Sequence, residues 1–126
     1  INFAGTGTNK HLVVADNDIL DNTNGFTLFV VFRTNLTASN YALLSKRTTV
    51  GTEQSYMTWV NAGQLSSRAS ANTVTGGTIN NSTTYVGTTV LNGAATTVAN
   101  FVNGTSAASG TGPASIPNNA SNLYIG

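Results

Sequence analysis

The sequence predicts an all-β fold, an antiparallel β-sandwich, from three observations. Residues 25–33 form one segment of strand length that is apolar on both faces and therefore needs cover on both sides. Turn dipeptides and polar breaks recur about every eight to twelve residues, as in sandwiches and barrels. Apolar residues nowhere repeat at the three- and four-residue spacing of an amphipathic helix.

The segment Gly25–Arg33 is the most apolar part of the chain. Its side chains alternate, so Phe26, Leu28, Val30 and Phe32 share one face. We expect that face to meet a second sheet. Phe29 and Val31 share the other face, which then has to be covered by loops or by another chain. If it is left uncovered, it forms an apolar strip that marks an interface.

The other expected strands are shorter and separated by polar connections. Outside the hairpins described next, they cover Lys10–Ala15, Tyr41–Lys46, Ser55–Val60, Leu65–Ala71 and Leu123–Ile125. The stretch 73–83 is rich in Thr, Asn and Gly, and we expect a polar connection there that turns at Gly76-Gly77.

Two Asn-Gly pairs, Asn92-Gly93 and Asn103-Gly104, give the clearest local signal. Asn-Gly is preferred in two-residue hairpin loops because both central residues need a positive φ. A β-meander of strand, turn, strand and turn is therefore predicted, with strands over Tyr85–Leu91 and Ala94–Val102, and Thr105–Ser109 follows it. A further turn is expected over Asn61–Gln64.

Composition excludes several classes of partner. The chain has five Lys or Arg and four Asp or Glu residues, with a net charge of +1. No stripe of cations is present for a phosphate backbone, so nucleic acid is not an expected partner. The longest apolar run, Leu28–Phe32, is far shorter than the roughly 20 residues that span a bilayer, so no membrane insertion is expected. The polar surface is mainly Thr, Ser and Asn, which suits the outside of a cell or virion.

The chain contains no cysteine, so it has neither disulfides nor thiolate metal ligands. At 126 residues it is long enough for one sandwich domain. It opens on Ile1 rather than Met, and we expect residues 1–126 to be one domain excerpted from a longer chain.

The order of motifs resembles the laminin-G-like, concanavalin A-like lectin and glucanase superfamily. The motifs are Phe26–Phe32, then Leu43-Leu44-Ser45-Lys46, then Tyr56 to Leu65 across a turn, then Phe101-Val102-Asn103-Gly104, and finally Leu123-Tyr124-Ile125-Gly126. The resemblance implies a jelly-roll sandwich. It also implies a closing strand after Gly126, which either a neighbouring segment or chain supplies or the longer chain contains.

Three aspartates form the only acidic cluster. Asp16, Asp18 and Asp21 are spaced so that their oxygens could converge on Ca²⁺, with carbonyl groups completing the shell. Laminin-G-like modules often hold Ca²⁺ at loop ends, so the resemblance implies the same ion. The alternative is that Asp and Asn are here because they cap turns, which needs no metal.

The candidate ligand-binding site consists of aromatic and amide side chains around one turn. Trp59 is the preferred contact because polar residues surround it, and Tyr56, Asn61 and Gln64 complete the candidate site. A sugar ring stacks on such aromatic faces. The alternative is that these aromatics are core residues.

We expect no enzyme activity. Glycoside hydrolysis needs two carboxyl groups at a fixed separation, and Glu53, the one Glu, stands in a loop with no acidic neighbour. His11 follows Lys10 at a strand start and lies in no nucleophile motif.

The sequence therefore predicts a non-enzymatic module on a virion appendage or a cell surface that binds a glycan or a protein. The alternative is a structural subunit, a decoration, fibre or filament domain that pairs with copies of itself in an assembly. A glycoside hydrolase is the third alternative, with Glu53 as its acid.

Overall fold

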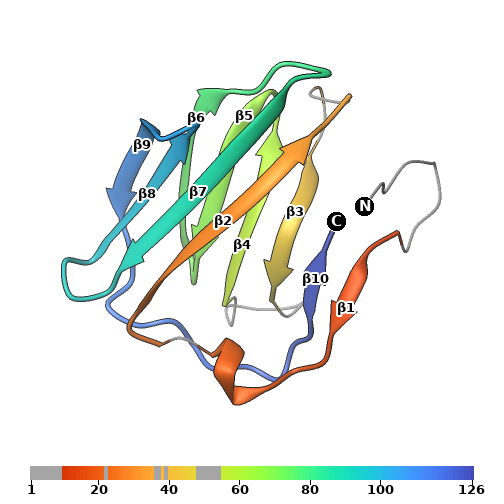
Figure 1. Ribbon diagram of the computed structural model, residues 1–126. Helices are drawn as coiled ribbons and strands as arrows, with labels where there is room; N and C mark the ends of the chain where they lie inside the picture. Colours follow the sequence, from red (N-terminus) through yellow and green to blue (C-terminus); the bar gives the residue numbers. More distant parts are fainter. Residues whose placement is uncertain (1–9, 22, 36–37, 39, 48–54) are drawn as a thin grey trace.

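The computed structural model describes residues 10–21, 23–35, 38, 40–47 and 55–126, and it confirms an all-β antiparallel sandwich. Two sheets pack face to face, and β2 and β7 lie across β3, β4 and β5 (Figure 1). Apart from one short 3₁₀ turn, η1 (Asp18–Leu20), the described residues contain no helix. No helix in this part of the chain is long and apolar enough to cross a membrane.

The six-stranded sheet has the order β1-β10-β3-β4-β5-β6. Its strands are β1 (Leu12–Val14), β10 (Leu123–Ile125), β3 (Tyr41–Lys46), β4 (Tyr56–Asn61), β5 (Gln64–Ala69) and β6 (Asn72–Thr78). Strand β10 comes last in the chain but pairs with both β1 and β3, so it ties the two ends of the described chain together.

The four-stranded sheet has the order β2-β7-β8-β9. Its strands are β2 (Gly25–Arg33), β7 (Thr84–Asn92), β8 (Thr97–Val102) and β9 (Thr105–Thr111). The apolar strand β2 pairs with β7 over its whole length and has no second partner strand among the described residues, so it forms an edge of this sheet as described.

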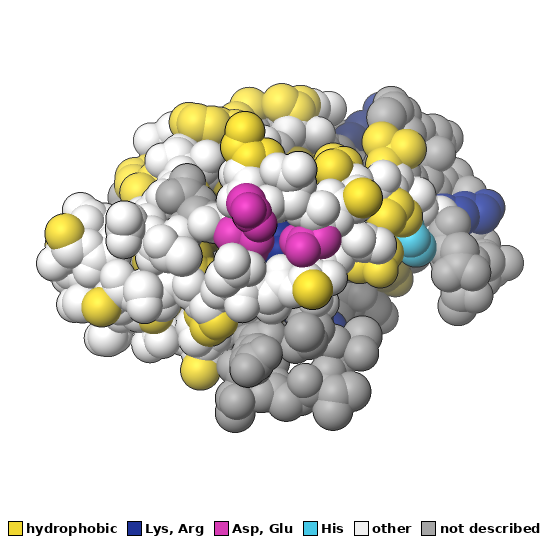
Figure 2. Space-filling view, turned by 90° about the horizontal axis from the view of Figure 1, so that it is seen from below, with side chains coloured by type: hydrophobic (Ala, Val, Ile, Leu, Met, Phe, Trp, Pro, Cys, Tyr) yellow, Lys and Arg dark blue, Asp and Glu magenta, His cyan; other side chains and the backbone are white. Residues whose placement is uncertain are grey.

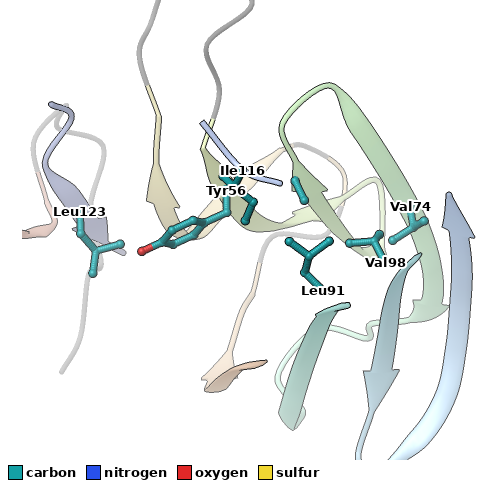
Figure 3. Packing of buried hydrophobic residues seen from close by; sticks show 7 residues of the cluster. Tyr56, Val74, Leu91, Val98, Ile116 and Leu123 are labelled. Atoms are coloured by element: carbon teal, nitrogen blue, oxygen red, sulfur yellow. The ribbon is translucent and has the colours of Figure 1, made fainter. Parts of the chain in front are cut away.

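The core consists of two apolar clusters between the sheets. One contains Tyr56, Leu91, Val98, Ile116 and Leu123; in Figure 3 the ring of Tyr56 points toward Leu123, and Leu91 and Val98 lie next to each other further along the cluster. The other contains Phe32, Val60, Leu65, Ile79 and Tyr85. As predicted, Phe26, Leu28, Val30 and Phe32 face the core, while Phe29 and Val31 point outward.

A buried polar layer accompanies the two clusters. The hydroxyls of Thr58, Ser67 and Thr89 hydrogen-bond one another, with Thr58 Oγ1 3.0 Å from Thr89 Oγ1. Asn100 Nδ2 donates to the carbonyl oxygens of Leu65 and Val74 at 3.3 Å each. Every member therefore has a partner, which is what makes a buried polar group tolerable.

The structure confirms some of the predicted turns and contradicts others. Asn103-Gly104 is a two-residue hairpin turn with φ of 50° and 78°, as predicted. Asn92-Gly93 is not, because β7 runs through Asn92 and the connection to β8 covers residues 93–96. The Gly76-Gly77 turn is also wrong, since both glycines lie inside β6 and the chain turns at Ser70-Ala71 instead.

Candidate functional site

The outer face of the six-stranded sheet holds a shallow depression of about 300 Å³. It is lined by Asn40, Ala42, Arg47, Met57, Trp59 and Arg68. Strand β4 sends alternate side chains outward, so Met57 and Trp59 point into the depression while their neighbours in β4 are buried. Strand pairing places Ala42 beside Trp59 and Arg68 beside Met57.

The depression offers three kinds of contact. The half-buried indole of Trp59 supplies an apolar face on which a sugar ring can stack. The guanidinium groups of Arg47 and Arg68 supply planar donors that suit carboxylate or sulfate oxygens. Arg68 Nε donates to Thr73 Oγ1 at 2.8 Å, which fixes the direction of its side chain. Asn40 adds an amide that can both donate and accept.

The four predicted ligand residues are not all brought together. Trp59 lines the depression. Tyr56 alternates with it and is buried in the core, where its hydroxyl donates to the Leu20 carbonyl oxygen at 3.1 Å. It is therefore out of reach of a ligand on the outer face. Asn61 and Gln64 pair across the β4–β5 turn and do not line the depression.

Sequence reasoning missed Arg47, Arg68, Asn40 and Met57. Met57 follows from β4 alternation alone, because residues two apart share a face. The two arginines depend on how β4 pairs with its neighbours, and that register is not encoded in any one segment.

Two of the three predicted calcium ligands converge, but on an ammonium group. Lys46 Nζ lies 2.8 Å from Asp16 Oδ1 and 2.8 Å from Asp21 Oδ1. Asp18 lies exposed in η1. Within the described residues no group of three acidic, His or Cys side chains is placed to hold a metal ion. Figure 2 shows the acidic side chains gathered at the surface with a Lys or Arg side chain between them.

Lys46 itself is completely buried, and its pKa reflects two opposing effects. Burial lowers the pKa of Lys46, but the hydrogen bonds and charges of Asp16 and Asp21 together outweigh it and raise the pKa above its ordinary value. The pKa of the neighbouring Tyr56 phenol is raised as well. Burial raises the pKa of Tyr56, the Lys46 charge offsets part of that rise, and the Asp21 charge adds to it.

The outer face of the four-stranded sheet carries an apolar patch, with Thr27 and Thr88 on the same face. Phe29 and Val31 are each 71% exposed, and Val86 is paired with Val31 on the same face. Strand alternation adds Val90 and Phe101. We call these five residues the apolar outer face. Of the charged side chains on the four described strands of this sheet, the one at its border is Arg33, at the end of β2.

Two candidate residues remain, Glu53 and His11. Glu53 lies outside the described residues. His11 packs edge-on against the ring of Tyr124, with ring centroids 5.0 Å apart. No protein-family model and no curated protein matches this sequence.

Proposed function

We propose that this domain is a non-enzymatic binding module of a virion or cell surface, and that it binds glycans on the outer face of its six-stranded sheet. The observation that carries the proposal is the half-buried Trp59 in a depression flanked by Arg47 and Arg68. An apolar platform with a few convergent polar groups is the usual form of a small-ligand site.

The resemblance to laminin-G-like and concanavalin A-like domains supports this proposal, because lectins belong to that superfamily. The guanidinium groups favour acidic sugars, because Arg donates to a carboxylate through two parallel hydrogen bonds. Calcium is not required in this proposal, since Asp16 and Asp21 already have the Lys46 ammonium as their ion-pair partner.

A glycan array carrying acidic and neutral sugars, probed with and without Ca²⁺, tests the proposal. We expect binding to acidic sugars in both conditions and a loss of about tenfold or more for Trp59→Ala, the worth of one stacking contact. Tyr124→Ala is the matched control, since Tyr124 is an exposed aromatic of the same sheet outside the depression. Equal binding by the two variants, or no binding to any sugar, contradicts the proposal.

A second candidate function, a structural subunit of an assembly, is favoured by a different observation. Phe29 and Val31 of the apolar outer face are exposed, and their strand, β2, is an edge strand within the described part of the chain. Exposed apolar faces and open edges are the surfaces through which β-domains associate. The face is uncharged, so it suits a second copy of itself rather than a charged partner.

Analytical ultracentrifugation over a range of concentrations tests this second function. We expect concentration-dependent association that is abolished by Phe29→Ser combined with Val31→Ser. Thr27→Ser, on the same strand and face, serves as the control. A wild-type chain that stays monomeric at every concentration contradicts it.

A further inference from the structure

Lys46 is the one fully buried charged side chain among the described residues, and it lies where three segments meet. It ends β3, and its ammonium contacts the segment after β1, the residue after η1 and the segment before β10. Neither proposed function uses this cluster.

Asn119 is the neighbour whose placement is not explained by an ion pair. It is only 6% exposed, and its carbonyl oxygen accepts from Lys46 Nζ at 2.7 Å. Its side-chain Oδ1 lies 3.5 Å from the same Nζ and accepts a hydrogen bond from the Ser121 N–H at 3.0 Å. Its Nδ2 is buried with no hydrogen-bond partner in the described chain. Buried amide groups without partners are rare and call for a physical account.

We propose that Lys46 and Asn119 join in an intramolecular amide bond between Nζ and Cγ, formed by the folded domain itself with release of ammonia. The fold brings an amine, a carboxamide and two proton-transfer groups together around the buried Lys46 side chain, and such proximity is what the reaction needs.

The chain's own groups supply each proton transfer. The Lys46 ammonium gives one proton to the Asp16 carboxylate, 2.8 Å away, which neutralises one of two negative charges held against a single positive one. Burial favours the neutral form of Lys46, but the two carboxylates outweigh burial and hold the proton on the amine, so the bond is expected to form slowly. The freed lone pair then attacks Cγ of Asn119.

In the tetrahedral intermediate the negative charge develops on Oδ1 of Asn119. The Ser121 N–H already points at that oxygen and stabilises the charge, in the manner of an oxyanion hole. The new C–N nitrogen gives its extra proton to Asp21, and Nδ2 takes the proton from Asp16 as the C–N bond to Nδ2 breaks. The released ammonia takes the proton from Asp21 and leaves as ammonium, so both aspartates return to carboxylates and the atoms and charges balance.

Such a bond explains the unpartnered Nδ2, which is the leaving group and is absent from the product. It would also give this chain, which has no cysteine, a covalent cross-link between β3 and the segment before β10. A closed loop of this length restricts the unfolded chain as a disulfide does.

Intact-mass spectrometry of the purified chain tests the proposal. We expect the wild type to be lighter than its sequence by about 17 Da, the mass of ammonia. Asn119→Ala should have its full sequence mass, and Asn118→Ala, which removes an exposed neighbouring amide, should still show the loss. Circular dichroism checks that both variants are folded.

Peptide mapping separates this bond from a backbone succinimide at an Asn-Gly pair, which also loses ammonia. After trypsin, the proposed bond joins the peptide 34–47, uncut after Lys46, to the peptide 69–126. A full-mass wild type, a loss that persists in Asn119→Ala, or a loss of about 18 Da that maps to an aspartate overturns the proposal.

Discussion

Adjacent residues of β2 face opposite environments. The same charged substitution should therefore lower the stability strongly at one position and only slightly at the other. Val30 packs against the cluster of Phe32, Val60 and Leu65, whereas Val31 is 71% exposed. Val30→Asp puts an unpaired carboxylate against that core, and we expect a loss of about 3 kcal/mol or more in the free energy of unfolding. Val31→Asp should stay within about 1 kcal/mol of wild type. Urea unfolding measures both, and a folded Val30→Asp of wild-type stability would contradict the strand's orientation.

A second prediction at this scale concerns alkaline pH. It is made for the Asn119→Ala variant, whose Lys46 amine stays free in either case. The pKa values of Lys46 and Tyr56 are raised above their ordinary values of 10.5 and 10.0. Above pH 10 the unfolded chain therefore loses these protons first, and the folded state binds more protons than the unfolded one.

The free energy of unfolding of this variant should accordingly be flat up to about pH 10 and fall as the pH rises through the folded pKa values. Urea unfolding from pH 8 to 12 measures the change. Adding Tyr56→Phe removes the phenol, so the slope that remains belongs to Lys46. A stability that rises above pH 10 would contradict the assigned contacts.

At the scale of elements, the two Asn-Gly pairs show that a strong local signal need not produce the expected turn. Gly104 follows Asn103 in the predicted turn and has a φ of 78°, with open space where a Cβ would point. Gly93 has no positive φ but donates its N–H to the Asn24 carbonyl oxygen at 3.0 Å, so it is a site of close backbone approach.

The two glycines should therefore respond differently to alanine. Gly104→Ala adds only the strain of a left-handed conformation, about 1 kcal/mol. A Cβ at Gly93 would overlap the Asn24 carbonyl oxygen and lie 2.6 Å from the Ala114 carbonyl oxygen, and we expect a loss of about 3 kcal/mol. Thermal unfolding of both variants ranks them, and a larger loss for Gly104→Ala would contradict this account.

A strand was predictable where its own sequence alternates apolar and polar side chains. It was not predictable where pairing with a neighbouring strand determines that it forms. Alternation alone predicted the inner and outer faces of β2 and the strands β3 and β4. It failed at β6, where a polar, Gly-containing stretch becomes a strand because β5 pairs with it. The same limit applies to the contact between Lys46 and Asn119, which are 73 residues apart and meet only because distant segments pack together.

For the molecule as a whole, the two sheets present outer faces of opposite character. The six-stranded sheet carries Trp59 with two guanidinium groups, and the four-stranded sheet carries the apolar outer face. A ligand and a second copy of the chain could therefore bind at the same time, one on each side of the sandwich.

The two faces should also respond to salt in opposite directions. Association through the apolar outer face buries no charge pair, so it should not weaken as NaCl rises from about 0.05 to 1 M, and it should strengthen on warming from the cold. Binding of an acidic sugar beside Arg47 and Arg68 should weaken over the same range because salt screens exposed charges. Sedimentation and sugar titration of the same sample measure both, and association that is lost in high salt would show that charged residues elsewhere hold the copies together.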